Sequence, residues 1–160
     1  MKSIFLALTV FFTGSAKAQN KSLSDLLTHY YHLKNELVAG NQQQAAAIAV
    51  QFKNAAAAVS IKQLNAAELK TFEPLQQSLI DAAGIIASAG DINKQRDAFI
   101  SLSNAMIVLA RGIKLTDKEV YVDYCPMKKA SWLSGEKAIK NPYYGNSMLT
   151  CGSVKETINP

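Results

Sequence analysis

Apolar residues recur every three or four positions along most of the chain, the spacing that places side chains on one face of an α-helix. The first such stretch comprises Leu23, Leu26, Leu27, Tyr30, Leu33 and Leu37. Ser22 or Ser24 is suited to cap its start, and Gly40 is suited to end it. The pattern therefore predicts an amphipathic helix between these positions.

A second helix is expected over about residues 42 to 59, where alanine, the residue with the best intrinsic helix propensity, is abundant. At helical spacing, its apolar face consists of Ile48, Phe52, Ala55 and Val59. Small residues on that face favour a close approach of the neighbouring helix.

The third helical segment contains a proline. It opens with Asn65-Ala-Ala-Glu68, which has the form of a capping box. Pro74 either begins a restarted helix, after a short turn that ends near Thr71, or kinks a single long helix. We favour the restart, with the helix reaching about Ala89 and Gly90 acting as its C-cap.

A fourth helix is predicted from Asp91, a good N-cap residue, to about Gly112. Its apolar stripe comprises Ile92, Phe99, Leu102, Met106, Leu109 and Ile113. Four amphipathic segments with short connections favour an antiparallel four-helix bundle over residues 22–114. We therefore expect a mainly α fold.

The helical spacing stops near Glu119, and the composition changes with it. Both cysteines, the only tryptophan and three of the four prolines follow this residue. Residues 120–124 alternate in the β manner, residues 154–158 are suited to pair with them, and a helical turn is expected near residues 134–139. We predict a small irregular or β-hairpin C-terminal lobe over residues 119–160, packed on the bundle.

The N-terminus has the features of a secretory signal peptide. Lys2 precedes an apolar run over residues 4–12, and Ala16-Lys17-Ala18 matches a small-x-small cleavage site. This run is shorter than the roughly 20 residues that a membrane-spanning helix needs. We expect residues 1–18 to be removed, leaving residues 19–160 as one exported domain, periplasmic or secreted and not inserted in the membrane.

Charge and motifs argue against several functions. Removal of Lys2 and Lys17 lowers the formal net charge from +5 to +3, and this mild excess is spread along the chain, unlike a nucleic-acid-binding surface. The sequence contains no Gly-rich phosphate loop, Gly-x-Ser-x-Gly or His-Glu-x-x-His motif. Its only histidines, His29 and His32, are predicted on a solvated helix face, far in sequence from Cys125. We therefore expect no enzymatic activity.

Four sulfur-containing side chains form two pairs at the ends of the lobe. Cys125 and Met127 are two residues apart, and Met148 and Cys151 are three apart. If the lobe folds back on itself, the four sulfurs can converge, and thiolate together with thioether favours Cu(I) or Ag(I) over zinc. Trp132 would then shield the metal from water.

A disulfide is the alternative use of the same residues. A bond between Cys125 and Cys151 would close a loop of about 26 residues, which the chain-entropy model credits with roughly 3 to 4 kcal/mol. Met127 and Met148 would then fill gaps in the packing, and Trp132 would plug a small core. The spacing alone leaves both interpretations open.

Four short motifs in the lobe resemble one bacterial domain family of unknown function, numbered thirty-three forty-seven. They are Cys125-Pro-Met127, Trp132-Leu-Ser134, Asn141-Pro-Tyr-Tyr-Gly145 and Met148-Leu-Thr-Cys-Gly152. Residues 30–38 and 99–103 are similar to the family's first and last helices, so the resemblance is expected to cover the mature chain. Members occur as stand-alone exported proteins, and a similar domain ends some periplasmic adaptor subunits of copper/silver RND efflux pumps.

The resemblance implies a context of copper and efflux, and it favours the metal site over a bare disulfide. We therefore expect a periplasmic module that binds Cu(I) or Ag(I) through its four sulfurs, and buffers the ion or passes it to an efflux adaptor. Tyr124 and Tyr143 are expected to support the site together with Trp132. The alternative is a disulfide-stapled structural or interaction module of the cell envelope that binds no metal.

Overall fold

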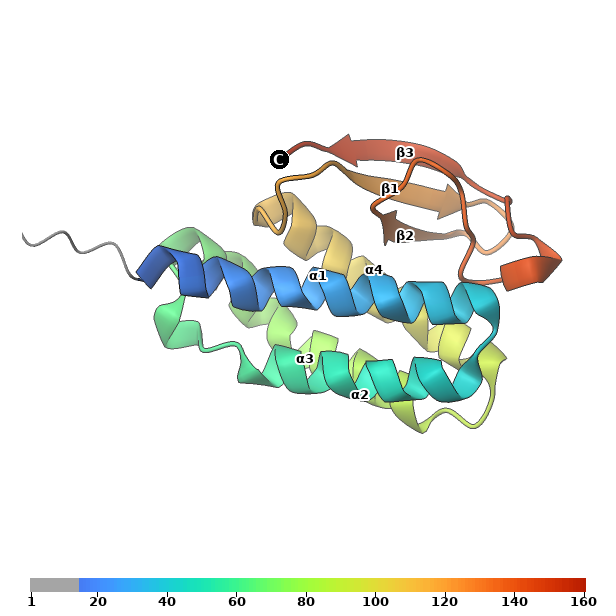
Figure 1. Ribbon diagram of the computed structural model, residues 1–160, viewed down its shortest axis with the longest axis horizontal. Helices are drawn as coiled ribbons and strands as arrows, with labels where there is room; N and C mark the ends of the chain where they lie inside the picture. The colour runs from blue at the N-terminus through green and yellow to red at the C-terminus, as the bar shows by residue number, and fades with distance from the viewer. Residues whose placement is uncertain (1–14) are drawn as a thin grey trace, which may run out of the picture.

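Four helices packed side by side carry a three-stranded antiparallel sheet in the computed structural model, which describes residues 15–160 (Figure 1). The helices are α1 (Ser15–Ala39), α2 (Gln42–Ala58), α3 (Ala66–Ser88) and α4 (Ile92–Gly112), with the short 3-10 helix η1 (Ile61–Gln63) between α2 and α3. None of the described helices is long and apolar enough to cross a membrane. The mainly α fold with a small C-terminal lobe is confirmed.

The predicted start of the first helix is wrong. Helix α1 begins at Ser15, and the Ser24 hydroxyl donates to the Lys21 carbonyl inside the helix instead of capping its end. The predicted signal peptide, residues 1–18, lies outside the described residues except for its last four positions. Gly40, with φ +80°, follows the helix as expected, in the left-handed conformation that glycine adopts without strain.

The apolar stripes of α1 and α4 face the core as predicted. All six residues of the α1 stripe are buried, and so are five of the six on α4, with Ile92 only partly buried. Helix α2 departs from the prediction, because Ile48 and Ala55 are only partly buried. Its buried face consists of Ala45, Ala49, Phe52 and Ala56, where alanines let the neighbouring helices approach more closely than an isoleucine would.

Two of the predicted helix caps are formed. The Asn65 side chain accepts hydrogen bonds from the amides of Ala67 and Glu68, and the Glu68 carboxylate accepts one from the Asn65 amide. Asp91 caps α4 by accepting from the amides of Asn93 and Lys94. At the end of α3, by contrast, the C-cap is Ala89 in an extended conformation, and not Gly90.

The predicted helix restart at Pro74 is wrong, because α3 continues through this residue. A proline inside a helix removes the hydrogen bond to the carbonyl four residues earlier, which here belongs to Lys70. Both Pro74 and Lys70 are exposed, so water can satisfy that carbonyl. The break that the sequence suggested is therefore not required.

The sheet contains β1 (Val120–Cys125), β2 (Ala130–Ser134) and β3 (Ser153–Ile158) in the order β2-β1-β3. The predicted antiparallel pairing of residues 120–124 with 154–158 is confirmed. Strand β2 was not predicted, and residues 134–139 form no helical turn; a turn of 3-10 helix, η2, lies at Gly145–Ser147 instead.

Tyr30 of α1 ties the sheet to the bundle. Its hydroxyl accepts a hydrogen bond from the Leu133 amide of β2 (3.0 Å) and is hydrogen-bonded to the Ser103 hydroxyl of α4 (2.7 Å). Its ring stacks on Phe99 of α4, with centroids 5.1 Å apart. One buried side chain thereby fixes the position of the C-terminal lobe over α1 and α4 (Figure 1).

Candidate metal centre

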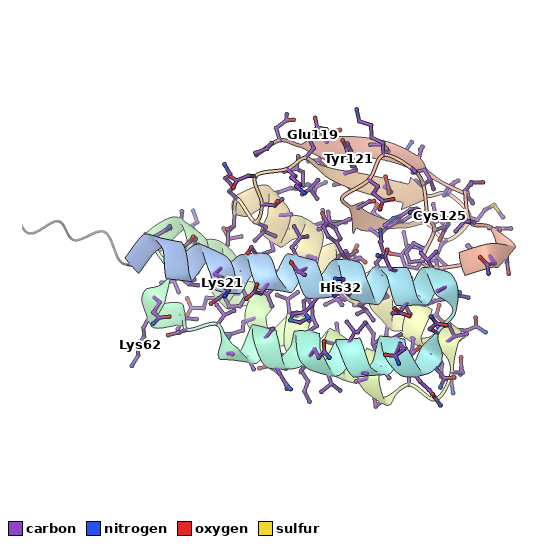
Figure 2. All side chains as sticks on the ribbon, viewed as in Figure 1. Lys21, His32, Lys62, Glu119, Tyr121 and Cys125 are labelled. Atoms are coloured by element: carbon purple, nitrogen blue, oxygen red, sulfur yellow. The ribbon has the colours of Figure 1, made fainter. Side chains whose placement is uncertain are left out.

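The two cysteines lie together at one end of the sheet. Cys125 is the last residue of β1 and Cys151 comes shortly before β3, so the pairing of these strands brings together two sulfurs that are 26 positions apart. Their Sγ atoms are 3.6 Å apart, and both thiols are free. Cys125 is at the opposite end of β1 from Tyr121 and Glu119 (Figure 2). The predicted convergence of the two halves of the lobe is therefore present for the thiols.

Cys125 is fully buried and is surrounded by hydrogen-bond donors. The Lys128 amide donates to its Sγ at 3.4 Å. Burial by itself would raise the pKa of the Cys125 thiol, but hydrogen bonds from the Lys128 amide, the Asn141 side chain, the Cys151 thiol and the Met127 amide outweigh it and lower that pKa. The hydrogen bonds at this site therefore make the Cys125 thiol more acidic than an ordinary cysteine.

Cys151 has the opposite character. It is partly exposed, and its hydrogen bond to Cys125, with smaller contributions from burial and from the Cys125 charge, raises the pKa of its thiol. Cys125 is therefore the buried and more acidic member of the pair, and Cys151 is the more accessible and less acidic one. This asymmetry depends on the folded structure, which buries Cys125, holds the Lys128 amide against its sulfur and brings Cys151 beside it.

The two methionines adjoin this pair through their backbones. The Met127 amide is close enough to both sulfurs to lower the pKa of each thiol, and the Cys151 amide donates to the Met148 carbonyl at 3.1 Å. Their side chains are open to solvent, with 62% of Met127 and 39% of Met148 exposed. The thioethers are therefore available to a ligand that enters from solution.

Asn141 holds the segment around Cys151 in place, and sequence reasoning gave it no role of its own. It is fully buried; its Nδ2 donates to the Cys151 carbonyl at 2.7 Å, and its Oδ1 accepts from the Tyr143 amide at 2.8 Å. The second bond is the local turn that asparagine side chains often make with the backbone two residues on. The Asn141-Pro142 step was the sequence signal that could have revealed it.

Trp132 and Tyr143 form a buried aromatic layer beside the thiols. The two rings meet edge to face with centroids 5.8 Å apart, and the Tyr143 hydroxyl donates to the Ser131 carbonyl. Burial, together with the nearby Cys125 charge, raises the pKa of Tyr143. Tyr124 differs from them, because it is partly exposed and its ring lies 5.8 Å from the Lys155 ammonium.

Asp123 is a second buried polar group that the sequence analysis missed. It is fully buried on β1 opposite Trp132, and neither carboxylate oxygen has a hydrogen-bond partner among the described residues. Burial raises the pKa of Asp123 to about 6, and Lys34 of α1 partly opposes this shift. The sequence signal that could have revealed this buried carboxylate was a charged residue in the middle of a strand with alternating apolar positions.

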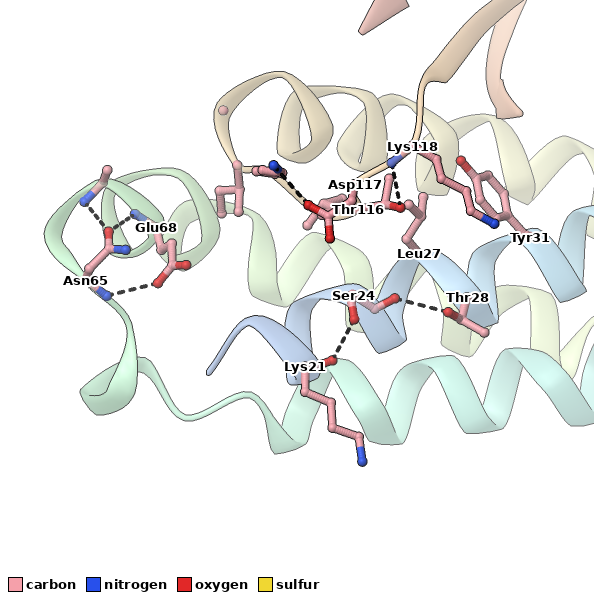
Figure 3. Close-up of a pocket in the computed structure, with 15 residues that line it drawn as sticks. Lys21, Ser24, Leu27, Thr28, Tyr31, Asn65, Glu68, Thr116, Asp117 and Lys118 are labelled. Atoms are coloured by element: carbon pink, nitrogen blue, oxygen red, sulfur yellow. Dashed lines mark hydrogen bonds and ion pairs between the residues drawn. The ribbon is translucent and has the colours of Figure 1, made fainter. Parts of the chain in front are cut away.

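A cavity of about 740 Å³ with a mixed polar and apolar lining lies near Lys21, toward the N-terminal end of α1 (Figure 3). It is bounded by α1, the start of α3 and residues 112–118. Its charges are mixed: Lys114 pairs with Asp117 at 3.0 Å, and the Glu68 carboxylate is engaged in the cap of α3. The cavity does not share residues with the cysteine pair.

The two histidines belong neither to the cysteine pair nor to the cavity near Lys21. His32 is exposed, as predicted, and His29 is only partly buried. Across the described part of the chain, no group of three or more His, Cys, Asp or Glu residues is arranged to hold a metal ion. Completion of a metal site at the cysteines would therefore depend on thioethers or on ligands from a partner.

Comparison with known proteins gave one result. A family model described as "Protein of unknown function (DUF3347)" matches residues 26–118. Searches of curated proteins and of solved structures found no match. The matched range covers most of α1 and all of α2, α3 and α4 and ends before Cys125, so the expectation that the family resemblance extends over the lobe is not confirmed. Since more than half of the chain is matched, the protein belongs to the DUF3347 family of proteins of unknown function.

Proposed function

We propose that this protein is an exported, periplasmic module that binds a soft monovalent metal ion, Cu(I) or Ag(I), at Cys125 and Cys151. The carrying observation is the 3.6 Å separation of the two Sγ atoms, one of which lies among N–H donors that favour a thiolate. Metal ligation requires the thiolate form of cysteine. Met127 and Met148 supply the further ligands in this proposal.

The distance between the thiols suits a shared ion. Thiolate sulfur lies about 2.3 Å from zinc, so two sulfurs bound to one ion of similar size are at most about 4.6 Å apart. The two cysteines already lie within that limit, and only small movements would be needed to admit an ion. Thiolate and thioether without imidazole is a soft ligand set, which favours Cu(I) or Ag(I).

The role supported by this site is binding and transfer, not catalysis. Sulfur ligands that are partly open to solvent allow an ion to pass to another set of sulfur ligands by stepwise exchange. The exposed thioethers of Met127 and Met148 are suited to make the first contact in such an exchange. An efflux adaptor of the RND type is the proposed acceptor, on the basis of the sequence resemblance.

A Cu(I) titration tests the proposal. The reduced protein is titrated against a competing chelator, and the parent is compared with Cys125→Ser and with the double variant Met127→Leu and Met148→Leu. We expect the serine variant to lose tight binding and the double variant to bind about tenfold more weakly with little change in unfolding free energy, since Leu and Met are similar in volume. Met106→Leu, in the core of α4, is the control for loss of a thioether elsewhere.

The outcomes of the titration show which of the sulfurs are metal ligands. Unchanged affinity in the double methionine variant would show that the thioethers are not ligands. Unchanged affinity in Cys125→Ser would refute the site as a whole.

A disulfide-stapled structural module is the second candidate, and the same distance between the thiols favours it. Sulfurs 3.6 Å apart need to approach to about 2.05 Å to form a disulfide. Thiols would be counted in protein purified from the periplasm without reductant. A fully oxidised pair, with no Cu(I) binding after gentle reduction, would establish this alternative over the metal-binding module.

A further inference from the structure

The two sulfurs differ in how a reagent from solution can reach them. Cys125 has no exposed surface and belongs to the buried core cluster that also includes Ala130, Trp132 and Tyr143. Cys151 is partly exposed. Thiol–disulfide exchange requires the attacking thiolate to approach along the S–S axis, so access decides which sulfur is attacked. In a disulfide between these residues, the sulfur open to attack is that of Cys151.

The sulfurs also differ in how well they can leave. The sulfur displaced in the exchange departs with the bonding electron pair, and a stabilised thiolate leaves faster. The Lys128 amide already donates to Cys125 Sγ at 3.4 Å. Hydrogen bonds of this kind stabilise negative charge on sulfur. Access and leaving ability therefore select the same direction of reaction.

We propose that the pair is a redox switch with a fixed polarity, in which Cys151 is the site of thiolation and Cys125 is the leaving sulfur. The sulfur of an incoming thiolate attacks Cys151 Sγ and forms a bond to it. The Cys125–Cys151 bond breaks at the same time, and its electron pair remains on Cys125 Sγ. A second thiol then attacks the mixed disulfide and releases Cys151. Two thiols are oxidised to one disulfide, and the protein disulfide is reduced.

The polarity of the switch does not depend on metal binding; only its functional consequence rests on the proposed function. Oxidised cysteines have no thiolate to offer a metal, so reduction at Cys151 would turn on metal binding. The reductant is a thiol, either a small molecule or a protein, that needs to contact only the exposed side of the pair. The neighbouring Met148 and Leu149 side chains are also exposed.

Mapping of the mixed disulfide tests the polarity. The purified protein is oxidised with diamide, treated briefly with reduced glutathione, quenched with acid and alkylated with iodoacetamide, and its peptides are analysed by mass spectrometry. We expect glutathione on Cys151 and alkylated Cys125 to exceed the reverse pattern by about tenfold or more, because access and leaving ability act together. Equal labelling, glutathione mainly on Cys125, or failure of diamide to join the cysteines would overturn the proposal.

Two controls test whether the fold causes the preference for Cys151 over Cys125. The same reaction in concentrated guanidinium chloride should label both cysteines to a similar extent, and persistent selection there would assign it to local sequence and refute the structural argument. In the reduced single variants, Cys151 in Cys125→Ser should react with glutathione disulfide faster than Cys125 does in Cys151→Ser. No metal enters these measurements, so a failed Cu(I) titration and a failed polarity test can be told apart.

Discussion

Replacement of Tyr30 by phenylalanine is expected to loosen the attachment of the sheet to the bundle. The substitution removes one oxygen atom and keeps the ring that stacks on Phe99. It deprives the Leu133 amide and the Ser103 hydroxyl of their shared partner, and all three residues are fully buried. The substitution creates no large cavity, so the loss of unfolding free energy measures the contribution of these hydrogen bonds.

The magnitude follows from the groups left without partners. A buried polar group that loses its hydrogen-bond partner costs about 1 to 3 kcal/mol. The Leu133 amide is a fixed backbone donor that cannot turn toward another acceptor, whereas the Ser103 hydroxyl can rotate toward a carbonyl of its own helix. We therefore expect Tyr30→Phe to lower the free energy of unfolding by about 1 to 3 kcal/mol, mostly through the amide.

Urea unfolding followed by circular dichroism measures this loss. Tyr31→Phe, at the next position of α1, is the matched control, because the Tyr31 hydroxyl is buried without a described partner and its removal should be neutral or slightly stabilising. In Tyr30→Phe/Ser103→Ala, the two losses should not add, with a coupling of about 1 kcal/mol. A change below about 0.5 kcal/mol in Tyr30→Phe would refute the view that this hydroxyl fixes the sheet.

Three further predictions test the lobe. Burial raises the pKa of Asp123 from 3.8 to about 6, beside Tyr31 and Lys34 of α1, so the folded protein retains a proton that the unfolded chain loses between about pH 4 and 6. Stability should fall as pH rises through that window, and Asp123→Asn should be more stable than the parent by about 1 to 3 kcal/mol near neutral pH in urea unfolding; a parent profile that is flat with pH would contradict this. Gly152→Ala would place a Cβ 2.9 Å from Trp132 Cη2 at a φ of +147°, so thermal unfolding should show a loss of about 2 to 4 kcal/mol. Gly90→Ala, where no heavy atom lies within 4 Å, is its control, and equal effects of the two would count against the argument. Glu156→Gln removes the exposed ion pair with Arg111 and should cost less than about 1 kcal/mol in the same assay, less so at high salt.

The helices were predictable because their signals are local. The stripe of α1, the capping box at Asn65 and the N-cap at Asp91 each depend on residues within one or two turns of each other. Pro74 was misjudged for a non-local reason, because the cost of the lost hydrogen bond depends on whether the free carbonyl meets water. That exposure is set by how the helices pack.

Strand β2 was missed because its pattern carries little local information. Residues 130–134 include two serines and an alanine, and their conformation depends on pairing with β1 and on the Tyr30 hydroxyl that accepts the Leu133 amide. Lys129, with φ 54°, makes the turn in a conformation that non-glycine residues seldom adopt. Long-range contacts therefore decided this element.

The sequence by itself determined the residue types of the candidate site, the four amphipathic helices and the pairing of β1 with β3. Hydrophobic spacing, caps and the clustering of cysteine and methionine carry that information along the chain. Only the tertiary structure decided that the thiols lie 3.6 Å apart, that one is buried among N–H donors and the other partly exposed, and that Asp123 is buried without a partner. Burial and hydrogen bonding depend on segments that are distant in sequence, so they exist only once the chain has folded.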